Sequence, residues 1–269
     1  GGLLALLACL GLARLSHEAT PALAQLSFSA VLFYALANLN RRRLSALSFA
    51  LIAIIGMTLS GAPALALVLG AGGALILAMD ANKPFSLRVR RVDVAWVLLI
   101  CLASAAVATA LGLWRWRVPY SNVLEIKSIT RLLLWFTWPA WPLAIWTLWR
   151  WRYQLRHILA NPHLSLPLWF VVVTLVSTYF SGSSDRSLLL ALPAMATLAA
   201  FALPTLQRSV SAFLDWFTLL FFSAGALIMW IVWLSMHTGI PAQPAINVSR
   251  LAPGFVPQFS AMAFCIALL

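Results

Sequence analysis

Residues 181–209 read SGSSDRSLLLALPAMATLAAFALPTLQRS and join a short polar loop to a long apolar run. The apolar run covers residues 188–206 and is interrupted only by Pro193 and Pro204. Another apolar run, residues 164–180, precedes the loop. Each run is close to the roughly 20 residues with which a helix crosses a bilayer. The stretch therefore predicts two membrane-crossing helices that meet at a tight polar turn.

The polar turn carries Asp185 and Arg186 side by side. An acid and a base at the mouth of a membrane hairpin are candidates for a binding site, because ionisable residues close to lipid are often functional. The alternative is that both side chains only solvate the turn, since exposed loop charges contribute little. The sequence alone leaves both interpretations open.

The composition indicates an integral membrane protein. Hydrophobic residues make up 63% of the chain and charged residues 9%, whereas soluble domains carry roughly 25% charged residues. The mean hydropathy is +0.95. Because helices satisfy their own backbone hydrogen bonds in lipid, we expect an all-α, polytopic transmembrane bundle. The net charge of +12 does not indicate a nucleic-acid partner, because the basic residues lie mostly in short loops between apolar runs.

The apolar runs predict about ten spans in a single transmembrane domain over residues 1–269, with no separate soluble domain. The first and last runs look cut, so we expect the chain to be a fragment that lacks an N-terminal part. The predicted spans are residues 1–15, 20–39, 44–60, 62–79, 92–113, 131–149, 164–180, 188–206, 213–236 and 259–269.

The dense basic clusters predict the orientation of these spans. Placing residues 41–43 in the cytoplasm also places residues 83–91, residues 150–156 and Arg208 there, as the positive-inside rule expects. The outer loops are then residues 16–19, 114–130, 181–187 and 237–258.

Two further patterns concern helix packing. Pro139 and Pro142 predict a kink in the tryptophan-rich span 131–149. Its tryptophans suit either a lipid groove or ordinary packing. Residues 121–130 predict a short helix in the interface, and the small residues 70–73 would let helices approach closely.

Six basic residues lie just outside the apolar runs on the predicted outer face. Guanidinium and ammonium groups at that depth suit a phosphate or diphosphate, although headgroup contact and snorkelling are the simpler alternatives. These candidate substrate-binding residues, with Asp185 beside one of them, are Arg115, Arg117, Lys127, Arg131, Arg186 and Arg250.

The acids are few and lie outside the spans. Asp80, Asp93 and Asp215 fall at predicted cytoplasmic ends, where loop solvation explains them. The outer acids are Glu18, Glu125 and Asp185. The lack of an acid within a span weakens a proton-coupled transporter interpretation. The three cysteines and four histidines show no metal-ligand spacing.

Four stretches resemble bacterial membrane glycosyltransferases of the protein O-mannosyltransferase and aminoarabinose transferase superfamily, the family 39 and GT-C type. In SSDRSLLLALPAMATLAAFALPTLQRS, Arg186 and Pro193 match the family's Arg-Tyr and following proline, while Ser187 replaces the tyrosine. The other stretches are LLLWFTWPAWPLAIWTLWRWR, LDWFTLLFFSAGALIMWIVWLSMHTGIPAQPAINVSRLAPGF and ARLSHEATPALAQL.

The resemblance implies an enzyme that takes a sugar from a polyprenyl-phosphate donor and passes it to a lipid or protein acceptor. It implies a site on the periplasmic side of the bacterial inner membrane, as in lipopolysaccharide modification. It also implies a principal catalytic acid, and often a divalent metal, in an outer loop that this fragment lacks. Glu18 is the local candidate for a second acid, and a solvated loop glutamate is the alternative.

A transporter or flippase of lipid-linked substrates is the competing hypothesis. Paired broken helices with inverted repeats would favour it. An acidic outer loop after the first span would favour the enzyme.

Overall fold

A computed structural model describes residues 2–15, 20–79, 91–114, 123–155, 161–180, 188–206 and 208–268. These ranges are built from helices and contain no β-strand, so the all-α prediction is confirmed for them. The chain divides into two compact units, residues 1–205 and residues 206–269. The single transmembrane domain expected from the sequence stays a prediction.

The first unit holds most of the helices, and several of them begin at a proline, which is favoured at the first helical position. Its helices are α1 (Gly2–Leu7), α2 (Leu10–Leu15), α3 (Pro21–Asn38), α4 (Arg43–Leu59), α5 (Pro63–Ala78), α6 (Arg91–Ala110), α7 (Val123–Phe136), α8 (Ala140–Arg150), α9 (Arg152–Leu155), α10 (Pro162–Phe180) and α12 (Leu192–Ala202). Short 3₁₀ turns flank α12 at Leu189–Ala191 and Leu203–Thr205.

Four helices are long and apolar enough to cross a membrane, so the prediction of a membrane protein is supported. Within the described residues these are Pro21–Asn38, Arg91–Ala110, Pro162–Tyr179 and Val210–Thr238. Arg43–Leu59, Pro63–Ala78 and Leu189–Thr205 are apolar but shorter. The count of about ten spans therefore stays a prediction.

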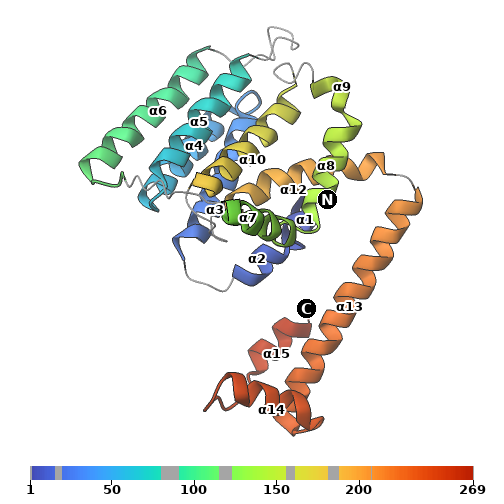
Figure 1. The fold of residues 1–269 in the computed structure, drawn as a ribbon. Coiled ribbons are helices and arrows are strands. Elements are labelled where there is room, and N and C mark those ends of the chain that lie inside the picture. Colours follow the sequence, from blue (N-terminus) through green and yellow to red (C-terminus); the bar gives the residue numbers. More distant parts are fainter. Residues whose placement is uncertain are drawn as a thin grey trace. The chain divides into compact units, whose positions relative to one another are not determined.

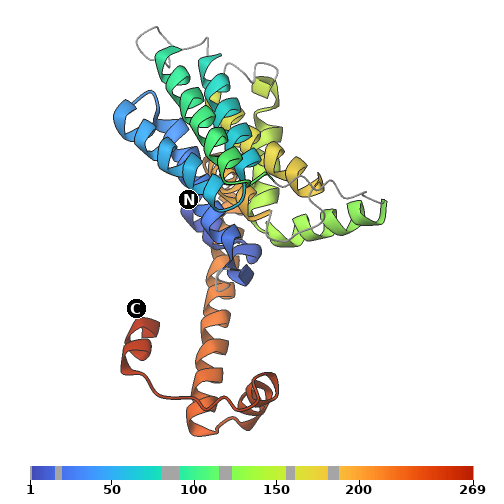
Figure 2. The same ribbon diagram turned by 90° about the vertical axis from the view of Figure 1, so that its left-hand side faces the viewer.

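Helices α4, α5, α6 and α10 pack side by side in the first unit (Figures 1 and 2). Glycines of α5 allow this close packing. A Cβ on Gly72 would lie 2.2 Å from a ring carbon of Trp169 in α10, and one on Gly73 would lie 2.6 Å from a methyl of Leu36 in α3. The expectation that residues 70–73 let helices approach closely is confirmed.

Asp93 corrects one expectation from the sequence. Its side chain is only 4% exposed, and it forms an ion pair with Arg43, the first residue of α4. The sequence predicts a solvated loop acid, because it does not reveal that the starts of α4 and α6 meet. A hydrogen bond of 2.6 Å between Thr58 and Ser104 joins the same two helices further along.

The region 121–149 also differs from the prediction. The expected interfacial helix and the first part of the sixth span form one helix, α7, without a boundary at Arg131. The predicted interruption near Pro139 is confirmed, because α7 ends at Phe136 and α8 begins at Ala140. Pro139 has no N–H with which to continue the helical ladder.

The second unit consists of α13 (Arg208–Thr238), α14 (Ala242–Leu251) and α15 (Ala261–Leu268). The hydroxyl of Ser235 in α13 accepts from the N–H of Ala245 at 2.9 Å and donates to the carbonyl of Pro241, so it ties α14 to α13. Phe264 of α15 packs edge-on against Trp230 of α13, with 5.9 Å between ring centroids.

Candidate functional site

Two helix breaks in the first unit meet and position the candidate site. The first break separates α1 from α2 at residues 8–9, and the second separates α7 from α8 at residues 137–139. The backbone N–H of Leu10 donates to the carbonyl of Trp138 at 3.1 Å. Each break leaves backbone groups without helical partners, and this bond satisfies one group from each side.

Helix α2 lies directly against the end of α7. A Cβ on Gly11 would lie 2.3 Å from a ring carbon of Phe136, which is fully buried. The absence of a side chain at Gly11 therefore lets α2 approach the aromatic ring. This contact holds the start of α2 beside the break that follows α7.

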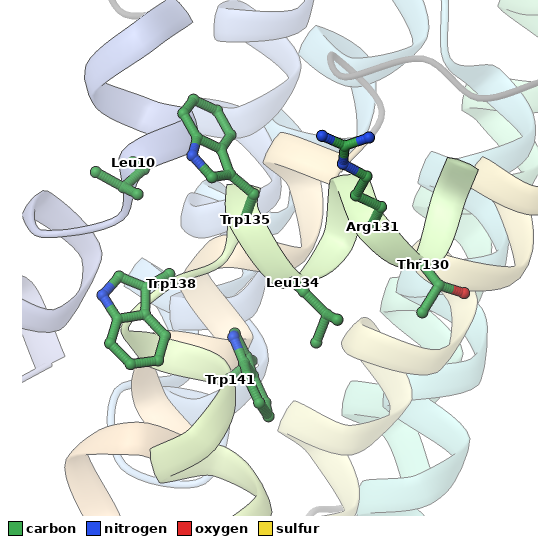
Figure 3. Close-up of a pocket in the computed structure, with 7 residues that line it drawn as sticks. All are labelled: Leu10, Thr130, Arg131, Leu134, Trp135, Trp138 and Trp141. Carbon is green, nitrogen blue, oxygen red and sulfur yellow. The ribbon is translucent and has the colours of Figure 1, made fainter. Parts of the chain in front are cut away.

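An open groove of about 770 Å³ lies where these elements meet (Figure 3). Its walls are almost entirely apolar, and three of its residues are tryptophans. Leu10 comes from α2, Trp138 from the second break and Trp141 from α8. The complete lining is Leu10, Thr130, Arg131, Leu134, Trp135, Trp138 and Trp141.

Arg131 supplies the groove with a positive charge. Its side chain is exposed, and no carboxylate of the described residues lies within ion-pair distance of it. Figure 3 shows Arg131 and Trp135 projecting from one side of α7, as residues four positions apart on a helix do. The rings of Trp138 and Trp141 lie nearer α8, with centroids 6.3 Å apart.

The polar groups of the groove are mainly hydrogen-bond donors. A guanidinium and an indole N–H can donate but cannot accept. The indole N–H of Trp141 is shielded from solvent and has no acceptor within the part of the chain that the structure describes. A ligand that offers only acceptor oxygens, attached to an apolar chain, matches this arrangement of groups.

Among the predicted site residues whose side chains the structure describes, Arg131 lines this groove. Lys127 belongs to α7, but its side chain lies outside the described part. Arg250 is exposed in the last turn of α14, in the second unit. The remaining predicted residues, which lie outside the described residues, are Glu18, Arg115, Arg117, Asp185 and Arg186.

The sequence indicates the tryptophans of the groove as possible lining residues but gives no signal for Leu10, Thr130 or Leu134. Residues 1–15 contain no proline that would signal the break before Leu10. The tertiary bond to Trp138 marks that break, and no local pattern reveals such a bond. Thr130 was assigned to the end of an interfacial helix, whereas it lies within α7.

A metal site cannot be assigned to this part of the molecule. The resemblance implies a divalent metal, but the described ranges contain no group of three or more His, Cys, Asp or Glu residues that could hold one. The polar side chains of the groove are donors rather than the carboxylate oxygens that hard divalent cations prefer.

Comparisons with protein-family models, with curated proteins and with solved structures found no match.

Proposed function

We propose that this chain belongs to a GT-C-like glycosyltransferase that moves a sugar from a polyprenyl-phosphate donor to a lipid or protein acceptor. The reaction would take place on the periplasmic side of a bacterial inner membrane, in a bundle of about ten spans. The observation that carries the proposal is the tryptophan-lined groove with the exposed guanidinium of Arg131 at its side.

The chemistry of the donor matches the groove in two respects. A polyprenyl chain is apolar and packs against indole rings and leucine side chains, which gain roughly 25 cal/mol per Å² of apolar surface removed from water. A phosphodiester oxygen accepts hydrogen bonds, and a guanidinium donates two in parallel. The indole N–H of Trp141 is shielded from solvent, so the exposed guanidinium of Arg131 is the donor that the groove presents to the phosphate.

Sugar transfer requires charge stabilisation on the leaving phosphate. As the acceptor oxygen or nitrogen attacks the anomeric carbon, the bond to the phosphate oxygen breaks and negative charge accumulates there. Arg131 would stabilise that charge by a fixed positive group in a site of low polarity. The acceptor also needs a carboxylate to take its proton. Glu18, three positions beyond the end of α2, is the candidate within this chain.

One observation favours the transporter or flippase hypothesis. The two interrupted helices that meet at Leu10 and Trp138 have the pairing that transporters use to build midplane sites. Against it, the carbonyl of Trp138 already accepts from Leu10, and that of Thr137 accepts from Ala140 at 2.8 Å. Each of these oxygens already uses a lone pair in a backbone hydrogen bond, so we rank this hypothesis second.

An assay with two readouts separates the hypotheses. The protein is reconstituted in vesicles with undecaprenyl-phosphate-linked sugars that carry a label. Covalent transfer of the label to membrane lipid or to protein supports the enzyme. Movement of the intact donor across the bilayer without transfer supports the flippase. Absence of transfer with every donor and both acceptor classes, while the protein remains folded, contradicts the proposed function.

A further inference from the structure

A second surface lies at the other end of α8 from the groove. The chain there reads Trp-Arg-Trp-Arg-Tyr over residues 149–153, and we call these residues the α8–α9 belt. Trp149 and Tyr153 are 66% and 65% exposed. Arg150 and Arg152 are exposed too, and neither has an ion-pair partner among the residues the structure describes.

The guanidinium of Arg152 lies against two aromatic rings. Its central carbon lies 5.3 Å from the ring centroid of Trp149 and 4.7 Å from that of Tyr153. It also donates long hydrogen bonds to the carbonyl of Trp149 at 3.4 Å and to the hydroxyl of Tyr153 at 3.5 Å. Cation–π contacts of this kind orient a guanidinium while leaving it open to an anion.

The backbone of the belt is fixed by the middle residue. Trp151 stacks on Phe201 of α12, with ring centroids 5.7 Å apart and planes inclined by 28°. Its backbone N–H donates to the carbonyl of Thr147 at 2.9 Å, and the hydroxyl of Thr147 donates to the carbonyl of Leu198 at 2.7 Å. The two arginines therefore project from a turn that α12 holds in place.

We propose that the α8–α9 belt binds the phosphate of an anionic phospholipid headgroup. Exposed tryptophan and tyrosine rings at the end of an apolar helix favour the membrane interface, and two guanidinium groups beside them complement a negative phosphate. A soluble anion would leave the 66% exposed indole of Trp149 in water, whereas a lipid also covers that apolar surface, so the charge and the aromatic surface together indicate a lipid. This site is separate from the groove and does not depend on sugar transfer.

The test measures the affinity of phosphatidylglycerol for the protein by native mass spectrometry, with phosphatidylcholine as the neutral reference. The double variant Arg150→Gln/Arg152→Gln should weaken binding of the first phosphatidylglycerol on the order of 10-fold, the scale of losing two basic residues near an anionic surface. Phosphatidylcholine binding should not change. Arg152→Lys should lose affinity only a few-fold, because it keeps the charge but not the planar contact with the rings.

Arg41→Gln/Arg42→Gln is the matched control, because it removes two exposed arginines from another basic cluster. Its affinity for phosphatidylglycerol should stay within about twofold of the parent, since no ring contact with either arginine is found in the described ranges. If both double variants lose the same affinity for phosphatidylglycerol, general charge attraction explains the binding and the proposal is overturned. Unchanged affinity in the belt variant, or full displacement of the lipid by millimolar inorganic phosphate, would overturn it as well.

Discussion

Arg131 is an exposed cation at the side of an apolar groove, and its role can be tested by changing its charge and its shape separately. Arg131→Ala should lower kcat/KM for the polyprenyl-phosphate donor roughly 10- to 150-fold, because a charge-assisted hydrogen bond contributes about 1.5–3 kcal/mol. Arg131→Lys should recover only part, since an ammonium cannot form two parallel bonds. Steady-state kinetics at varied donor concentration measure both effects.

Arg91→Ala serves as the control for Arg131. Arg91 is an exposed arginine at the first residue of α6 and lies on the predicted cytoplasmic side. Its removal changes the net charge by the same amount but should leave donor kinetics at the parent level. If both Arg131→Lys and Arg131→Ala keep the parent kcat/KM for the donor, the Arg131 side chain does not bind the phosphate. It then only extends its charge to the aqueous interface, as a snorkelling arginine does.

The buried ion pair of Asp93 makes a prediction about stability. Asp93→Asn leaves the Arg43 guanidinium without its counter-charge, and loss of one partner of a fully buried pair costs about 3–5 kcal/mol. Because the Arg43 side chain is 41% exposed, water offsets part of this, and we expect about 1–3 kcal/mol. Thermal unfolding in detergent should show a lower midpoint. Asp215→Asn, at an exposed position of α13, should leave the midpoint unchanged, and equal midpoints for both variants would contradict the structural role of Asp93.

At the scale of the helices, the contact between α5 and α10 depends on Gly72. The Trp169 indole packs on Gly72 and donates to the carbonyl of Val68 at 3.3 Å. A methyl group at position 72 would displace this ring, so Gly72→Ala should destabilise the protein by about 1–3 kcal/mol, the usual cost of overpacking. Gly225→Ala on α13 meets open space and should be neutral or slightly stabilising, because alanine favours helices.

A double variant tests the physical cause of this effect. Gly72→Ala/Trp169→Leu replaces the ring that the new methyl group would strike. Its stability should exceed the value expected from adding the two single changes, since contacting residues do not act independently. Simple additivity in thermal unfolding would show that Gly72 matters for another reason, such as its own backbone.

Most helices could be located from the sequence, because apolar runs of sufficient length in lipid can only become helices. The predicted runs 20–39 and 92–113 lie within a few residues of α3 and α6. Pro139 gave a local signal for the break before α8. The break before Leu10 and the burial of Asp93 had no such signal, because both arise from contacts between segments far apart in the chain. Of the candidate groove, the sequence predicts only the tryptophans and Arg131 as possible lining or binding residues. The groove itself forms from segments far apart in the chain, so no local pattern reveals it.

For the whole molecule, the prediction concerns which ends of the helices face the cell exterior. Single cysteines at Gln154 and Gln243, both exposed positions, are introduced after the native cysteines have been replaced. The positive-inside pattern predicts that a membrane-impermeant maleimide labels Gln243→Cys in intact cells and labels Gln154→Cys only after permeabilisation. Labelling of both positions, or of neither, in intact cells would contradict the predicted orientation.

Helices α4 and α5 are short for membrane-crossing segments. They contain 17 and 16 residues, which correspond to about 24–26 Å at a rise of 1.5 Å per residue. The hydrocarbon core of a bilayer is about 30 Å thick. If α4 and α5 cross the bilayer, as the sequence predicts for residues 44–60 and 62–79, this hairpin would create a hydrophobic mismatch, which lipids relieve by thinning locally at a fraction of a kcal/mol per Å. Lipids with shorter acyl chains should therefore be enriched around this hairpin. The free-energy cost of the mismatch should be lowest in a thin membrane.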